Sequence, residues 1–175
     1  MALTLRTPLA EGREAPERER WLALVVVCLS VLVIVLDNTI LNVALPSIER
    51  SLGASSSQLQ WTVDAYTLVL ASFLLVAGST ADRLGRRRIF QTGLAIFGIG
   101  SLLCGLAPSI GWLIAERAVQ AVGGTMLNPV AMAIVVNTFH RPAERARAIG
   151  VFAAVSGVAL ALGPILGGAL VDGFG

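Results

Sequence analysis

Residues 21–45 read WLALVVVCLSVLVIVLDNTILNVAL, an apolar run that few polar side chains interrupt. A helix needs about 20 such residues to cross a hydrocarbon core of roughly 30 Å, because it rises about 1.5 Å per residue. A secretory signal would have a shorter apolar run and a cleavage site made of small residues, whereas this run carries Asp37 and Asn38 near its end. We therefore expect a transmembrane helix.

Four further apolar runs follow the first. Hydrophobic residues make up 55% of the 175-residue chain and charged residues only 14%, against about 25% charged residues in a typical soluble domain. The runs show neither a polar helical face nor the short alternating segments of barrel strands. We expect an all-α integral membrane protein whose surroundings are the lipid bilayer. Its parts are a polar cytoplasmic tail at 1–20 and a membrane domain at 21–175, with helices at about 21–45, 59–81, 89–107, 111–136 and 149–171.

The basic residues predict the orientation of the chain. All of them are arginines, and all except Arg50 and Arg117 cluster before the first apolar run, after the second and after the fourth. Clustered basic residues can indicate nucleic-acid binding, but clusters between apolar runs are typical of loops on the cytoplasmic side of a membrane. We therefore expect a cytoplasmic N-terminus and no nucleic-acid partner. The clustered residues are Arg6, Arg13, Arg18, Arg20, Arg83, Arg86, Arg87, Arg88, Arg141, Arg145 and Arg147.

Four charged residues lie inside the expected spans. Glu116 points about 100° away from its neighbour Arg117 around the helix and is left unassigned, and the other three are Asp37, Asp64 and Arg117. With the N-terminus inside, all three fall in the outer half of the membrane, although they belong to three different helices. A charged residue in a span costs about 2.5–3.5 kcal/mol on insertion scales, and it normally faces a cavity or a partner of opposite charge. Such residues also mark proton paths. We predict that these three couple the movement of protons and substrate.

Each of the three also has a plainer interpretation. Asp37 could take part in hydrogen bonds between helices together with its polar neighbours, which are Asn38, Thr39 and Asn42. Asp64 could be a solvated residue near the membrane surface. Arg117 could be a structural counter-ion, and this interpretation, like proton coupling, places it against a carboxylate.

The loop between the second and third spans, residues 78–88, reads GSTADRLGRRR. The orientation rule accounts for its arginines but not for its acid or its glycines. A carboxylate at the C-terminal end of a helix is unfavourable unless cations compensate it, and such charges suit a conformational latch. The residues that we assign to this cytoplasmic gate motif are Gly78, Asp82, Arg83, Gly85, Arg86 and Arg87.

The last span contains a dense group of helix-breaking and small residues, made up of Gly163, Pro164, Gly167 and Gly168. Proline removes a backbone hydrogen bond and clashes with the preceding turn, so a bend is expected. Glycines allow a neighbouring helix to approach closely. Generic membrane packing is the plainer interpretation of these residues.

These segments resemble the Major Facilitator Superfamily, over nearly all of the chain after Trp21. Residues 78–88 are similar to its signature Gly-x-Leu-Ala-Asp-Arg-x-Gly-Arg-Arg, with Thr80 in place of the usual Leu, and the resemblance implies a cytoplasmic gate latch. Residues 36–46 resemble the first-helix motif of the 14-span drug/proton antiporters of the EmrB/QacA type.

Three further segments carry the same resemblance. Residues 117–124 are similar to the fourth-helix motif linked to proton transfer, with Ala121 where Gly is common. Residues 163–168 resemble the antiporter motif of the fifth helix, with Ala159 in place of an upstream Gly. Residues 61–66 resemble the second helix of the branch whose members carry an acid there and export cationic lipophilic drugs.

The resemblance implies proton-coupled efflux of amphiphilic, cationic drugs across the cytoplasmic membrane of a bacterium, with a proton gradient and no cofactor. The family fold has two six-helix halves, each an inverted three-plus-three repeat. We expect this chain to be the first five helices of an incomplete N-terminal half, a fragment that needs the missing C-terminal transporter helices as partners.

The alternatives are a dedicated exporter of one metabolite or antibiotic, and a truncated membrane protein that does not transport. We do not expect an enzyme or a metal site, because His140 is the sole histidine and no metal-spaced His/Cys set or phosphate-binding Gly-Lys motif occurs.

Overall fold

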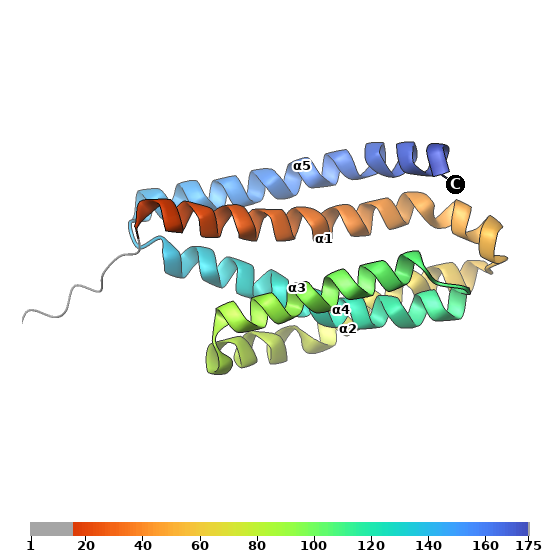
Figure 1. Ribbon diagram of the computed structural model, residues 1–175, viewed down its shortest axis with the longest axis horizontal. Coiled ribbons are helices and arrows are strands. Elements are labelled where there is room, and N and C mark those ends of the chain that lie inside the picture. The colour runs from red at the N-terminus through yellow and green to blue at the C-terminus, as the bar shows by residue number, and fades with distance from the viewer. Residues whose placement is uncertain (1–15, 175) are drawn as a thin grey trace, which may run out of the picture.

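The computed structural model describes residues 16–174 as five helices joined by short connections (Figure 1). The helices are α1 (Glu17–Leu52), α2 (Ser56–Leu84), α3 (Arg86–Gly105), α4 (Ile110–Thr138) and α5 (Pro142–Phe174). Each is long and apolar enough to cross a membrane, and no strand occurs in this range. The predicted all-α membrane architecture is therefore confirmed.

The helices extend further than the apolar runs in most places. The first was expected to end at residue 45, with Pro46 in a loop, but α1 continues through Pro46 to Leu52. Hydropathy marks the part of a helix that lies in hydrocarbon, whereas backbone hydrogen bonding continues into the headgroup region. The chain leaves α1 at Gly53, where a φ of 60° favours glycine.

The last helix differs most from the expected bounds, because α5 begins at Pro142 and not near residue 149. Proline suits the first turn of a helix, since the N–H that it lacks would have no partner there. Glu144 in the same turn complements the positive end of the helix dipole. α3 is the exception at its C-terminal end, because it stops at Gly105, two residues before the expected end.

The helices pack as two groups. α1 and α5 lie side by side along their lengths, and α4 packs against both α2 and α3 (Figure 1). Contacts between α1 and α2 and between α4 and α5 are few, so the two groups meet mainly along α1 and α4. Side chains on the facing surfaces of α1 and α4 therefore decide how the groups are joined.

The turns that carry the arginines share one end of the bundle. The α2–α3 and α4–α5 connections lie at the same end as the beginning of α1, whereas the α1–α2 and α3–α4 connections lie at the other (Figure 1). Every described arginine except Arg50 and Arg117 belongs to this end. The described part of the fold thus has one strongly basic end.

Candidate functional site

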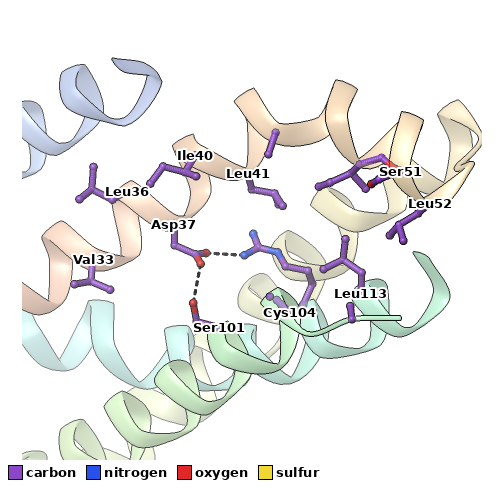
Figure 2. A pocket seen from close by; sticks show the side chains of 15 residues that line it. Val33, Leu36, Asp37, Ile40, Leu41, Ser51, Leu52, Ser101, Cys104 and Leu113 are labelled. Carbon is purple, nitrogen blue, oxygen red and sulfur yellow. Dashed lines mark hydrogen bonds and ion pairs between the residues drawn. The ribbon is translucent and has the colours of Figure 1, made fainter. Parts of the chain in front are cut away.

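A largely buried ion pair joins α1 to α4. Arg117 donates from Nη1 to Oδ2 of Asp37 at 2.6 Å (Figure 2). The Arg117 side chain is 2% exposed and that of Asp37 is 17% exposed. Two of the three ionisable residues predicted to share a membrane depth are therefore in direct contact, although 80 positions separate them in the chain.

Neutral side chains complete the network around this pair. Gln120 donates from Nε2 to Oδ1 of Asp37 at 2.8 Å, and its Oε1 accepts from Arg117 Nη1 at 2.8 Å. Asn38 Oδ1 accepts from Arg117 Nη2 at 3.0 Å. Ser101 Oγ of α3 makes a longer contact with Asp37 Oδ1 at 3.5 Å. The carboxylate thus receives donors from α3 and α4, and the guanidinium is fixed by acceptors on α1 and α4.

The polar neighbours of Asp37 divide into two kinds. Asn38 reaches another helix, as the plainer interpretation of Asp37 requires. Thr39 Oγ1 instead donates to the carbonyl of Val35 at 2.8 Å, and the Asn42 amide donates to the carbonyl of Asn38 at 2.9 Å. Thr39 and Asn42 therefore form their hydrogen bonds within α1, and the polar contacts with α4 come from Asp37 and Asn38.

An aromatic ring from α2 covers the guanidinium. The Cζ atom of Arg117 lies 4.4 Å from the centroid of the Tyr66 ring. This distance is within the range of a cation–π interaction, which is stronger when the cation is desolvated. Arg117 Nε and Tyr66 Oη are buried and make no hydrogen bond within residues 16–174. The guanidinium of Arg117 on α4 is therefore held by side chains of α1 and α2.

Asp64 lies apart from this network. It is half-buried on α2, and the described part of the chain gives it neither an ion pair nor a hydrogen bond. Tyr66 is two residues further along the same helix, about 3 Å along the axis, so the depth of Asp64 is similar to that of the pair. The structure therefore brings Asp37 and Arg117 together and gives Asp64 no partner among the described residues.

A cavity of about 530 Å³ opens beside the ion pair, between α1, α3 and α4 (Figure 2). Asp37, Ser101 and Arg117 line it at one depth, and Ser51 and Leu52 line it near the end of the bundle away from the arginines. Most of the remaining lining side chains are apolar. The cavity thus connects the carboxylate of Asp37 with the non-basic end of the fold.

The gate motif forms a second, exposed ion pair. Arg86 donates to Oδ1 of Asp82 from Nη2 at 3.0 Å and from Nε at 3.3 Å. Gly85 between the two helices has a φ of 96°, a conformation that favours glycine. Gly78 faces open space, and Arg83 and Arg87 are exposed, with no ion pair to either within residues 16–174. The negative charge of Asp82 is thus compensated by an arginine of the same motif.

The small residues of α5 pack against α1 next to the buried pair. A Cβ at Gly163 would collide with the side chain of Thr39, and one at Gly167 would lie 3.2 Å from Ile40 Cα. Pro164 lies inside α5, which continues to Phe174, and Gly168 faces open space. Two of the four motif residues therefore set the distance between α5 and α1.

A second inter-helix pair at the basic end was not predicted. Arg20 of α1 donates from Nη1 to Glu144 Oε2 of α5 at 2.8 Å. Phe139, in the α4–α5 connection, stacks edge-on against Trp21 with ring centroids 5.3 Å apart. The position of Arg20 directly before the apolar run was the available signal, because a charge there can reach a neighbouring helix end.

Gln120, Ser101 and Tyr66 were also not predicted as site residues. Gln120 follows Arg117 by three positions and so shares its helical face. Ser101 is a polar residue inside the third span, and Tyr66 follows Asp64 on α2. Spacing and polarity could therefore have pointed to the first two, whereas no pattern in the sequence pairs Tyr66 with Arg117.

Comparison with known proteins places these features in a family. The profile described as Major Facilitator Superfamily matches residues 27–175. The chain is 45% identical over 159 residues to the puromycin resistance protein Pur8 of Streptomyces alboniger, covering 91% of this chain and 32% of that protein. It is 44% identical over 154 residues to the multidrug efflux pump LfrA of Mycolicibacterium smegmatis, covering 88% of this chain and 31% of that protein.

The fold has a similar counterpart among solved structures. A bacterial homologue of the human lysosomal transporter Spinster, in an inward-facing and unoccupied conformation, superposes with a TM-score of 0.80 and 27% identity. The match covers 89% of this chain and 33% of that one. The chain spans about a third of the length of the relatives that it matches. With five membrane-length helices and a family match over most of its length, this multi-pass membrane chain belongs to the Major Facilitator Superfamily, a family of transporters.

Proposed function

We propose that the full-length protein exports lipophilic cationic drugs in exchange for protons, as a member of the 14-span antiporter branch. The observation that carries the proposal is the buried Asp37–Arg117 pair, which lies in the α1–α4 contact where the two packing groups of helices meet. The drug-resistance and drug-efflux relatives support export as the direction of transport.

Proton binding would act on this pair through charge. When Asp37 binds a proton, the carboxyl becomes neutral and Arg117 loses its counter-ion. A buried charge without a partner is unfavourable by several kcal/mol. The arrangement of α1 and α4 seen with the ion pair formed is then no longer favoured. A shift of α1 with α5 against α2, α3 and α4 is the movement that these contacts allow.

The cavity beside Asp37 suits the entry of protons from the outside. It leads from the carboxylate to the end of the bundle that lacks the arginine clusters. We place this end outside the cell and the arginine-rich end, with the N-terminus, in the cytoplasm of a bacterium. Protons then enter along their gradient, and no cofactor takes part.

The remaining motifs have parts in the same cycle. The carboxylate of Asp64 forms no ion pair with a described residue, and in this proposal it attracts the cationic substrate. The Asp82–Arg86 pair at the basic end acts as the cytoplasmic gate latch. Gly163 and Gly167 hold α5 against α1 beside the pair, so that both helices move together.

Efflux of ethidium, a fluorescent lipophilic cation, from cells that express the full-length protein tests the proposal. Asp37→Asn cannot bind and release a proton, and we expect it to abolish efflux driven by a pH gradient while the protein remains in the membrane. Glu49→Gln is the matched control, because it makes the same change at an exposed position of α1. Undiminished pH-driven efflux by Asp37→Asn would refute the coupling role.

A second candidate is the dedicated export of one antibiotic or metabolite, which the similarity to a puromycin resistance protein favours. The buried pair would then work in the same way, and the substrate range would differ. A panel of unrelated compounds, tested for efflux by the full-length protein, separates the two candidates. Export of several lipophilic cations supports the first, and export of a single compound supports the second.

A further inference from the structure

Tyr66 belongs to the buried network, but neither the sequence motifs nor the proton-coupling proposal assigns it a role. It is 4% exposed, and its ring contacts the guanidinium of Arg117 from α2. Gly124 of α4 provides room for the phenol, since a Cβ there would lie 2.7 Å from Tyr66 Oη. The contact between ring and cation is therefore built into the packing of α2 against α4.

The surroundings of Arg117 differ on its two sides. Toward α1, the guanidinium meets the carboxylate of Asp37 and the amide oxygen of Asn38. Toward α2, it meets the face of the Tyr66 ring, and its Nε makes no hydrogen bond within residues 16–174. When Asp37 is neutral, the amide oxygens of Asn38 and Gln120 and the ring are the groups left to hold the cation.

We propose that Tyr66 is a positioning residue that keeps Arg117 beside Asp37 while the carboxyl is protonated, so that the cation can expel the proton again. This inference rests on the proposed coupling role of Asp37. A cation held next to a carboxyl favours the ionised form of that carboxyl. Without the ring, Arg117 moves away from the neutral carboxyl, and the proton is retained at higher pH.

The other charged and titratable groups near the site are few. Asp37 faces it from α1, Cys104 from α3, Arg117 and Glu116 from α4, and Asp64 shares α2 with Tyr66. A substitution at Tyr66 leaves the chemical identity of all of these groups unchanged. A change in pH dependence would therefore report on the position of Arg117.

The hydroxyl and the ring of Tyr66 can be tested separately. Its Oη makes no hydrogen bond within the described range, although the Asn38 side chain lies near it. Tyr66→Phe therefore removes the hydroxyl and keeps the ring, whereas Tyr66→Leu removes the ring. Phe97→Leu is a matched control for lost packing, because Phe97 is a buried aromatic residue of the α3–α4 interface with no ring contact to Arg117 among the described residues.

The measurement is proton release from the purified full-length protein on addition of ethidium, followed with a pH-sensitive dye over a series of pH values. We expect Tyr66→Leu to raise the pH of half-maximal release by about one unit, and Tyr66→Phe and Phe97→Leu to retain the parental profile. An unchanged profile for Tyr66→Leu, or the same shift for Tyr66→Phe or Phe97→Leu, would overturn the inference.

Asp37→Asn distinguishes this inference from the function on which it rests. If Asp37→Asn still releases protons, the coupling proposal fails. If Asp37→Asn releases none while Tyr66→Leu retains the parental profile, only the role of Tyr66 is refuted.

Discussion

The Asp37–Arg117 pair and the Asp82–Arg86 pair join the same kinds of side chain in different surroundings. The first lies between two helices, with its side chains 17% and 2% exposed, and the second bridges the α2–α3 turn, with its side chains 65% and 35% exposed. Removing one partner of a buried pair costs about 3–5 kcal/mol, because the other charge stays buried. Exposed pairs contribute only about 0–1 kcal/mol.

This difference separates two uses of charge in one membrane protein. In the proposed cycle, the buried pair couples the arrangement of the helices to the charge of one carboxyl, so a single proton would have a large effect. The exposed pair is screened by water and can open and close at little cost, which suits a latch. Four substitutions test the comparison, and they follow in order of expected effect.

Arg117→Ala should have the largest effect on stability. It leaves Asp37 without its cation and removes the contact with Tyr66, so we expect a loss of about 3–5 kcal/mol. Thermal unfolding of the purified protein in detergent, followed by tryptophan fluorescence, measures it. The double variant with Asp37→Asn should recover part of the loss, because it removes the unpaired carboxylate. A loss as small as that of an exposed pair would contradict the comparison.

Gly163→Ala should weaken the buried pair from the opposite side of α1. The new Cβ collides with the Thr39 side chain, two residues from Asp37, and has to push α1 away from α5. Overpacking of this kind costs about 1–3 kcal/mol, and we expect the upper part of that range in the same unfolding measurement. Gly157→Ala on α5 is the control, because a Cβ there meets nothing within 4 Å. Equal stability of the two variants would show that this close approach is not needed.

Gly85→Ala tests the turn that carries the exposed pair. The φ of 96° at Gly85 is unfavourable for a residue with a Cβ, and we expect a loss of about 1–2 kcal/mol. Gly78→Ala lies in the same motif, within a helix and facing open space, and should cause no loss. If unfolding midpoints show no difference between the two, the turn does not depend on its positive φ.

Arg86→Ala should have the smallest effect. The pair with Asp82 is exposed, so we expect a loss of at most about 1 kcal/mol. A double-mutant cycle with Asp82→Asn isolates the interaction energy of the pair from other effects of each substitution. A coupling of several kcal/mol would place this pair in the same class as the buried one and remove the contrast between them.

Much of the architecture follows from local properties of the sequence. The apolar runs predicted five helices in a membrane, and the ends of those helices were less well predicted, because α1 and α5 continue beyond the apolar runs. Pro46, one residue beyond the first expected span, lies inside α1 for this reason. The roles of Asp37, Asp64 and Arg117 in coupling, and of the gate and antiporter motifs, stay predictions.

The sequence alone determined which segments enter the membrane and which ionisable groups they take with them, because transfer into lipid depends on the composition of each segment. The tertiary structure decided the partners of those groups. It paired Asp37 with Arg117, gave Asp64 no partner within residues 16–174 and placed the Tyr66 ring on the guanidinium. The physical reason is that these contacts depend on how helices distant in the chain rotate and pack, and no spacing within one segment encodes that.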